Sequence, residues 1–260
     1  MDANTVKVAF PKKGRLGDAF AQIWTEAGFS LVKADPRHSY GTAFSEAGSF
    51  TPFEATAQRD SDALEDLADN IADLAIVGLN ALKEFNAAAS ARGRDTVFAA
   101  PKPLNFSRCA MVLAGPGNSP LSDLRGLYGQ RIATSFPETL KDWLRSRDID
   151  TDRVEIVERD GGIEDYVRRG RADYAFDIYQ SGKTQEAYGL KPFYMAFEST
   201  AVAVVRNDAP RNVLELQDTL SQELSAASAR CINNGAISEP YRPPRLAAQD
   251  FTEQPRLMAA

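Results

Sequence analysis

The sequence predicts an α/β fold in which short strands alternate with helices. Apolar runs of strand length, such as residues 73–78 and 109–114, are separated by segments with helical periodicity. Glycine-containing loops with cationic or hydroxyl side chains follow several of these runs. This alternation is typical of a mostly parallel sheet, whose ligands bind outside the carboxyl ends of the strands.

The N-terminal part of the chain opens with one strand–loop–helix unit. Residues 6–10 form an apolar strand, residues 11–15 a basic glycine loop, and residues 16–28 a helical pattern. Residues 32–51 are rich in Ser, Gly and Ala, which predicts irregular structure or a short hairpin. The elements expected next are a helix from residue 61, a buried strand at 73–78 and a helix at 80–92.

The same alternation continues after a strand at residues 109–114. A loop rich in Gly and Pro follows at residues 115–120, in the region where a second lobe is expected to begin. Further strands are expected at residues 131–134, 154–157, 172–178 and twice within 193–206, with helices from Pro137 and at 163–169, 184–187 and 213–229. The polar, proline-rich residues 231–260 predict an extended or disordered tail.

Composition excludes several classes of protein. A formal net charge of -6 argues against a nucleic-acid or membrane-surface binder, which normally carries a basic face. Cys109 and Cys231 are too few and too far apart for a disulfide framework or a zinc site, and His38 is the single histidine. No secretory signal pattern and no apolar run of membrane-spanning length is seen, so a cytoplasmic location is expected.

Four loops that follow predicted strands carry groups suited to phosphate or sugar. Each is also compatible with a purely structural role, as a solvated basic edge, a helix N-cap or a carboxylate that complements a helix dipole. The loops are Lys12-Lys13-Gly14-Arg15, Thr134-Ser135, Asp160-Gly161-Gly162-Ile163-Glu164 and Asp177 through Thr184.

The fourth loop is the most informative. It places an acid, Asp177, at the end of a strand, and Ser181-Gly182-Lys183-Thr184 at the start of a helix. This arrangement suits a phosphate held by the helix start and sugar hydroxyls held by the acid. The Gly-Lys-Thr triplet does not make a P-loop, because that motif needs glycine where Asp177 stands.

Taken in order, these segments resemble the ATP phosphoribosyltransferase family over about residues 6–206. The matching segments are PKKGRL at 11–16, Arg59 to Asp62 with DLAIVG at 73–78, RIATSFP at 131–137, Gly161 to Glu164, and 177–184 followed by Tyr188-Gly189-Leu190. The resemblance implies two α/β lobes of the periplasmic-binding-protein type II architecture, with the active site in the cleft between the lobes. The implied lobe I is 1–104 plus 185–230, lobe II is 105–184, and 231–260 is the tail.

The resemblance also implies roles for individual residues. Ser181, Gly182, Lys183 and Thr184 would cradle the 5-phosphate of phosphoribosyl pyrophosphate, with Gly161 and Gly162 nearby. Asp177 and Glu164 would engage the ribose hydroxyls. The remaining implied contacts are Lys12, Gly14 and Arg15 at the pyrophosphate or ATP phosphates, Arg59 in the same cleft, and Thr134 and Ser135 beside the nucleotide.

The implied reaction joins N1 of ATP to C1 of phosphoribosyl pyrophosphate and releases pyrophosphate, the first step of histidine biosynthesis. Its transition state is oxocarbenium-like, so the protein mainly orients two anionic substrates and stabilises separating charge. Asp177, Glu164 and Arg15 are the expected catalytic residues. Mg²⁺ is expected on the pyrophosphate rather than on protein ligands.

The family further implies a homo-oligomer, and for its short members a regulatory subunit that resembles histidyl-tRNA synthetase. Long members carry a C-terminal histidine-sensing domain, which the single helix and tail seen here cannot form. Leu79, Ala75, Gln180 and Gln185 depart from the family pattern. These departures keep two alternatives open: a paralogous phosphoribosyltransferase with a different acceptor base, and a non-catalytic small-molecule binder of the same fold.

Overall fold

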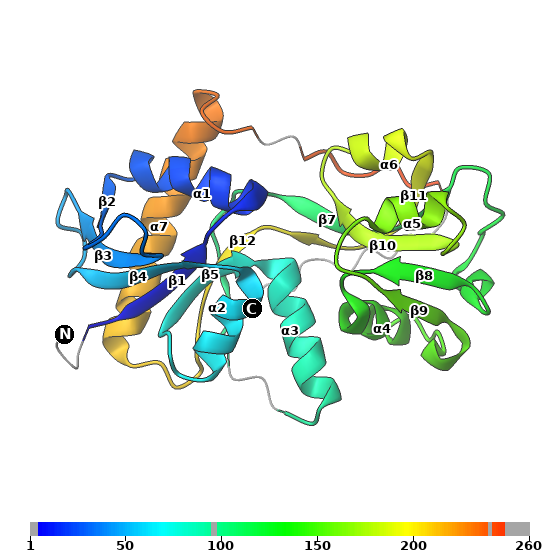
Figure 1. Cartoon of the computed structure of the whole chain (residues 1–260), viewed down its shortest axis with the longest axis horizontal. Coiled ribbons are helices and arrows are strands. Elements are labelled where there is room, and N and C mark those ends of the chain that lie inside the picture. The colour runs from blue at the N-terminus through cyan, green and yellow to red at the C-terminus, as the bar shows by residue number, and fades with distance from the viewer. Residues whose placement is uncertain (1–4, 95–97, 239–240, 248–260) are drawn as a thin grey trace. The chain divides into compact units, whose positions relative to one another are not determined.

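The computed structural model describes residues 5–94, 98–238 and 241–247. The chain divides into two compact units (Figure 1). Unit 1 contains the described residues of Met1–Ala89, Gly93–Arg108 and Thr200–Glu239, and unit 2 those of Ser90–Arg92, Cys109–Ser199 and Pro240–Ala260. Unit 2 is therefore largely inserted between two parts of unit 1.

Unit 1 is built on a seven-stranded sheet with the order β2-β3-β4-β1-β5-β12-β6. Its strands are β1 (Lys7–Pro11), β2 (Phe29–Val32), β3 (Tyr40–Ser45), β4 (Phe53–Gln58), β5 (Leu74–Gly78), β6 (Lys102–Pro103) and β12 (Ala201–Val205). Its helices are α1 (Gly14–Glu26), α2 (Asp60–Ala68), α3 (Leu79–Ala91) and α7 (Arg211–Asn233).

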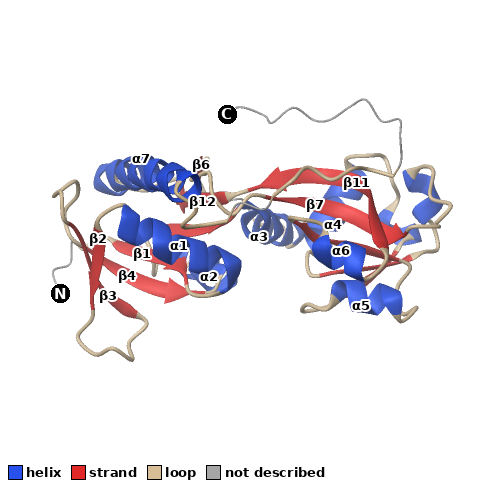
Figure 2. Ribbon diagram, turned by 90° about the horizontal axis from the view of Figure 1, so that it is seen from above, coloured by secondary structure: helices blue, strands red, loops and turns tan. Residues whose placement is uncertain are grey.

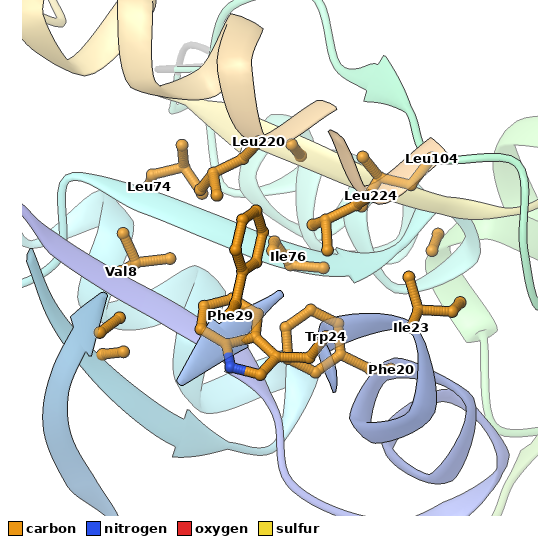
Figure 3. Close-up of a cluster of buried hydrophobic side chains, with 14 of the residues drawn as sticks. Val8, Phe20, Ile23, Trp24, Phe29, Leu74, Ile76, Leu104, Leu220 and Leu224 are labelled. Carbon is orange, nitrogen blue, oxygen red and sulfur yellow. The ribbon is translucent and has the colours of Figure 1, made fainter. Parts of the chain in front are cut away.

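Helices cover both faces of this sheet (Figure 2), as the alternation of side chains along β5 requires. Leu74 and Ile76 point to a cluster formed with α1 and α7, whereas Ala75 and Val77 point to a cluster formed with α2 and α3. Figure 3 shows the first cluster, in which Trp24 of α1 packs among aromatic and aliphatic side chains. Burial on both faces explains why β5 is apolar along its whole length.

Unit 2 is built on a five-stranded sheet with the order β11-β7-β10-β8-β9. Its strands are β7 (Cys109–Pro116), β8 (Arg131–Thr134), β9 (Glu155–Glu158), β10 (Tyr174–Tyr179) and β11 (Leu190–Ser199). Its helices are α4 (Pro137–Arg145), α5 (Ile163–Arg168) and α6 (Lys183–Ala187), with short 3-10 helices η1 (Leu124–Leu127) and η2 (Thr151–Arg153). One face packs on α4 around Trp143 and Phe176, and the other packs on α5 around Ile163 and Val167.

The expected α/β class is confirmed, but the expectation of a mostly parallel sheet is wrong. In the described part of the chain, antiparallel pairs outnumber parallel pairs. Residues 32–51, where irregular structure or a hairpin is expected, contain β3, which pairs antiparallel with β2 before it and with β4 after it. β12 and β7 reverse direction because each connects the two units instead of following a crossover helix.

Two segments lie elsewhere than the implied boundaries place them. Residues 190–199, expected in lobe I, form β11 and pair with β7 in unit 2. The expected tail begins too early, because α7 continues to Asn233 and buries Cys231. Residues 248–260 of that tail lie outside the described residues.

Across residues 5–94, 98–238 and 241–247, no helix is long and apolar enough to cross a membrane.

Candidate functional site

Three loops of unit 2 meet at one edge of its sheet. β10, β8 and β9 are neighbours and run parallel to one another, so their carboxyl ends lie at the same edge. The segments that follow these ends are residues 135–136, 159–162 and 180–182. The topology therefore brings together three of the four loops that the sequence singled out.

The loop after β8 is held by its own hydroxyl groups. Thr134 is fully buried, and its Oγ1 accepts a hydrogen bond of 2.8 Å from the Phe136 amide. Ser135 Oγ donates to the carbonyl oxygen of Arg159 at 2.8 Å and accepts from the amide of Gly161 at 3.3 Å. The turn itself accounts for the Thr134 hydroxyl, whereas Ser135 joins two of the loops and remains partly exposed.

An open cavity of about 530 Å³ lies over the second loop, lined by Ser135, Glu158, Arg159 and Asp160. Gly161 and Gly162 adopt positive φ values of 80° and 66°, which a side chain would oppose. These two left-handed residues turn the chain sharply into α5. The Arg159 guanidinium lies 4.7 Å from the centre of the Tyr166 ring, so a cation is held beside the cavity.

The third segment consists of the connection from β10 to α6, residues 180–182, and the first two residues of α6, and it is called the 180–184 loop below. Gly182 has φ of 77°, and a Cβ there would lie 2.5 Å from the Tyr179 hydroxyl. The left-handed backbone favours glycine here, and any larger residue would also require the Tyr179 ring to shift. Lys183 and Thr184 are exposed at the start of α6, where they are available to an anion.

Asp177 lies inside β10 rather than at its end, because the strand continues to Tyr179. It pairs in register with Val112 of β7 and is partly buried. Its Oδ1 accepts a hydrogen bond of 2.8 Å from the Ile178 amide.

Glu164 is tied to the 180–184 loop through Gln185, which is 4% exposed. The Gln185 side-chain nitrogen donates to Glu164 Oε1 at 3.1 Å and to the Ile178 carbonyl oxygen at 3.2 Å. Both partners are acceptors, so the amide must present its NH₂ group to them. One buried side chain thus joins α5, the end of β10 and the start of α6.

The remaining predicted residues lie in unit 1, at the carboxyl edge of its parallel strands β4, β1 and β5. The Lys12 amide donates to the Gln58 carbonyl oxygen at 2.9 Å, which brings Lys12 close to the backbone that leads to Arg59. Lys12, Gly14, Arg15 and Arg59 are all exposed, and Gly14 has φ of 75°. This edge is consequently a cationic surface.

Asp60 is a residue of this edge that the sequence did not single out. Its Oδ2 accepts a hydrogen bond of 2.9 Å from the amide of Gly78, where β5 ends and α3 begins. Desolvation raises the pKa of the Asp60 carboxyl, although this hydrogen bond opposes the rise. In the sequence, only the position of Asp60 directly after Arg59 indicates that it belongs to this edge.

The structure thus groups Ser135, Gly161, Gly162, Glu164 and the 180–184 loop in unit 2, and the cationic residues in unit 1. Among the described residues, no group of three or more His, Cys, Asp or Glu side chains is placed to hold a metal ion.

Comparisons of the sequence with known proteins all point to the same family. A sequence model of the ATP phosphoribosyltransferase family, HisG, matches residues 59–226. The ATP phosphoribosyltransferase of Xylella fastidiosa (strain M12) is 34% identical over 210 residues, covering 78% of this chain and 66% of that protein. That of Stenotrophomonas maltophilia (strain R551-3) is 32% identical over 206 residues, covering 79% and 65%.

Solved structures show the same fold. A chain of the ATP phosphoribosyl transferase (HisG:HisZ) complex from Thermotoga maritima superposes with a TM-score of 0.65 at 20% identity, covering 87% of this chain and 100% of that one. The arginine-, lysine-, histidine-binding protein ArtJ from Geobacillus stearothermophilus superposes with a TM-score of 0.50 at 12% identity, covering 91% and 93%. The expected periplasmic-binding-protein-like architecture is therefore confirmed.

The chain spans just under two thirds of the length of these curated relatives. The family match nevertheless covers most of the chain, including the three loops of unit 2 and Arg59, whereas Lys12, Gly14 and Arg15 precede the matched residues. On these grounds, the chain belongs to the ATP phosphoribosyltransferase family.

Proposed function

We propose that this protein joins N1 of ATP to C1 of phosphoribosyl pyrophosphate and releases pyrophosphate, the first step of histidine biosynthesis. The observation that carries the proposal is the convergence of the 180–184 loop, the Gly161–Gly162 turn and Glu164 at one sheet edge. A loop suited to phosphate beside a carboxylate is suited to bind a phosphorylated sugar. The reaction itself is inferred from the family to which the chain belongs.

In this proposal the 180–184 loop holds the 5-phosphate through Ser181, Lys183 and Thr184, and Gly182 allows close backbone approach. Glu164 and Asp177 accept hydrogen bonds from the ribose hydroxyls. Ser135 borders the nucleotide, and Thr134 supports it from within the turn. Asp177 approaches the sugar from inside β10. It directly precedes Ile178, whose carbonyl oxygen accepts a hydrogen bond from the Gln185 side chain.

The cationic edge of unit 1 is proposed to hold the phosphates of the second substrate and of the leaving group. Lys12, Arg15 and Arg59 supply positive charge where pyrophosphate charge develops as the C1–O bond breaks and the N1–C1 bond forms. Carboxylates near the ribose stabilise the positive charge that appears at C1. The protein supplies orientation and electrostatics, without a covalent intermediate.

Mg²⁺ is proposed to enter bound to the pyrophosphate oxygens. Hard oxygen ligands and retained water suit this ion, and substrate phosphates commonly supply them. As part of the substrate, the ion neutralises charge on the leaving group.

We also propose that the chain forms a homo-oligomer, and that a regulatory subunit is a candidate partner. The Thermotoga maritima relative is described as a HisG:HisZ complex. An assay of this chain alone tests whether such a subunit is required for turnover.

The test is an assay of purified protein with phosphoribosyl pyrophosphate, Mg²⁺ and ATP, which follows the ultraviolet absorbance of the adduct with pyrophosphatase present. Lys183→Ala and Thr184→Val should each raise the KM for phosphoribosyl pyrophosphate about tenfold or more, with little change in the KM for ATP, because a charge-assisted contact is lost. Lys191→Ala is the control, since Lys191 pairs with Gly115 at the opposite end of β7 from the loop.

Equal effects of Lys183→Ala on both KM values would refute the assignment of the 180–184 loop. Donor binding by calorimetry without an ATP adduct would instead point to a missing partner subunit or to the alternative with another acceptor base. Leu79 motivates that alternative, because it places a partly buried apolar side chain directly after β5.

A further inference from the structure

The described residues 241–247, called the C-terminal strap below, pack against unit 2. The Tyr241 hydroxyl donates to Glu198 Oε1 at 2.5 Å, and the Ala247 amide donates to the Pro192 carbonyl oxygen at 2.8 Å. Between them, the Arg242 amide donates to the carbonyl oxygen of Gln180 at 3.1 Å. The strap therefore contacts both β11 and the 180–184 loop.

The strap's two contacts with β11 occur in opposite order along the two segments. Tyr241 contacts Glu198 through its side chain, and Ala247 contacts Pro192 through its backbone. β11 is an edge strand of the unit 2 sheet, so the strap contacts this sheet at its edge. The amino-terminal part of the strap lies at the same edge of the sheet as the candidate site. Glu198, which contacts the strap, and Tyr179, which precedes the 180–184 loop, both pair with Ala110 of β7.

The strap is also suited to hold a fixed conformation. Pro243 and Pro244 restrict their own backbones, and Pro243 restricts Arg242 to extended conformations, so little entropy is lost on docking. The Tyr241 side chain packs against the same buried cluster of unit 2 as Tyr179 and Met195. Tyr179 in turn lies under Gly182 of the 180–184 loop.

We propose that the C-terminal strap is a part of the donor site, and that the Arg242 amide is a positioning group for the 180–184 loop. By holding the Gln180 carbonyl, it fixes the direction in which the chain leaves β10 and so places Ser181 to Thr184 for the sugar phosphate. This inference rests on the proposed function, because it assumes that the loop binds the donor phosphate.

The test compares Arg242→Pro with Arg242→Ala in the full chain. Proline removes the amide hydrogen and is compatible with the extended backbone before Pro243, whereas alanine keeps the amide and removes only the guanidinium. Titration calorimetry with Mg²⁺ and phosphoribosyl pyrophosphate should show about three- to tenfold weaker binding by Arg242→Pro, as expected for one lost hydrogen bond. Arg242→Ala should bind within about twofold of the wild type.

Steady-state kinetics give the second readout. Arg242→Pro should raise the KM for the donor and leave the KM for ATP unchanged, and Tyr241→Phe should show a smaller change in the same direction. A lower melting temperature for Arg242→Pro with unchanged donor binding would overturn the inference and leave the strap as a structural contact at the sheet edge only. An equal loss in Arg242→Ala would also overturn it, because the guanidinium would then carry the effect.

Failure of the proposed function is distinguishable from failure of this inference. If wild-type protein binds no phosphoribosyl pyrophosphate, both fall together. If the wild type binds and Arg242→Pro binds equally well, only the inference falls.

Discussion

Gln185 connects more of the candidate site than any other single side chain described above. Its two donated hydrogen bonds fix the Glu164 carboxylate relative to the backbone of β10. Because Gln185 is buried, we expect it to act on a ligand through its two partners, the Glu164 carboxylate and the Ile178 carbonyl oxygen. It is therefore a positioning residue rather than a catalytic one.

Gln185→Leu should weaken donor binding about three- to tenfold, since leucine fills a similar volume but donates no hydrogen bond to Glu164. A double-mutant cycle of Gln185→Leu with Glu164→Ala, measured by calorimetry, should be strongly non-additive because one residue acts through the other. Gln217→Leu is a matched control, as Gln217 is a buried glutamine of unit 1 that donates to the Ala203 carbonyl oxygen. Additive effects would mean that Gln185 acts independently of Glu164.

At this scale the sequence suggests roles for residue types but does not report contacts between distant residues. Gly182, Lys183 and Thr184 are predicted to form an anion site because glycine, cationic and hydroxyl side chains at a helix start are typical of one, and this role stays a prediction. The partnership of Gln185 with Glu164 joins residues from different helices, and nothing local in the sequence encodes it. Thr134 is a different case, because its hydroxyl, which suggested a ligand contact, accepts a hydrogen bond from the amide two residues along its own turn.

At the scale of elements, the start of β8 and the start of β10 are joined by one ion pair. Arg131 and Asp173 form two side-chain contacts, of 2.9 and 3.1 Å, and the Arg131 amide donates to the same carboxylate. The hydrogen bonds from Arg131 hold the pKa of Asp173 below its ordinary value of 3.8. The pair fixes these two strands at the end opposite to the candidate site.

Asp173→Asn should lower the free energy of unfolding at neutral pH by about 1 kcal/mol, a modest value because solvent screens this partly exposed pair. The folded-state pKa is depressed, so this stabilisation is present above pH 3.8 and is lost as the pH falls through the lower folded value. Urea unfolding at pH 7 and at successively lower pH should show the wild type and the variant converging. Asp18→Asn, at an exposed position on α1, is the control variant and is unfolded under the same conditions.

Elements with a strong apolar pattern were predicted well, and elements defined by pairing were not. β5 and β8 lie within one residue of the positions that their apolar runs indicated. β4 was missed although its sequence alternates between apolar and polar residues, and its pairing with β1 is remote in sequence. Strand direction in β7 and β12 depends on the connection between units, which local periodicity does not report.

At the scale of the whole molecule, each unit contains one buried tryptophan. Trp24 packs in the unit 1 cluster with Phe20 and Phe29, and Trp143 stacks on Phe176 in unit 2. Among the described residues, Trp143 Nε1 has no hydrogen-bond partner, so phenylalanine at this position removes no hydrogen bond. The two fluorophores therefore report the two units separately.

Unfolding in denaturant should be followed by fluorescence in Trp24→Phe and Trp143→Phe variants. Mg²⁺ with phosphoribosyl pyrophosphate should raise the midpoint reported by Trp143 more than that reported by Trp24, since a ligand stabilises the part of the protein that binds it. A larger rise in the midpoint reported by Trp24 would indicate that unit 1 makes the main contacts with the donor. ATP alone provides the comparison ligand.

The insertion of unit 2 within unit 1 has a consequence for biosynthesis. Residues 109–199 leave the ribosome before β12, so the sheet of unit 2 can form while unit 1 still lacks a strand and its longest helix. β5 must wait for β12 to cover its side, as the pairing of Gly78 with Ala201 shows. A nascent chain stalled before residue 200 would expose that apolar strand edge, and chaperone engagement should concentrate there until translation resumes.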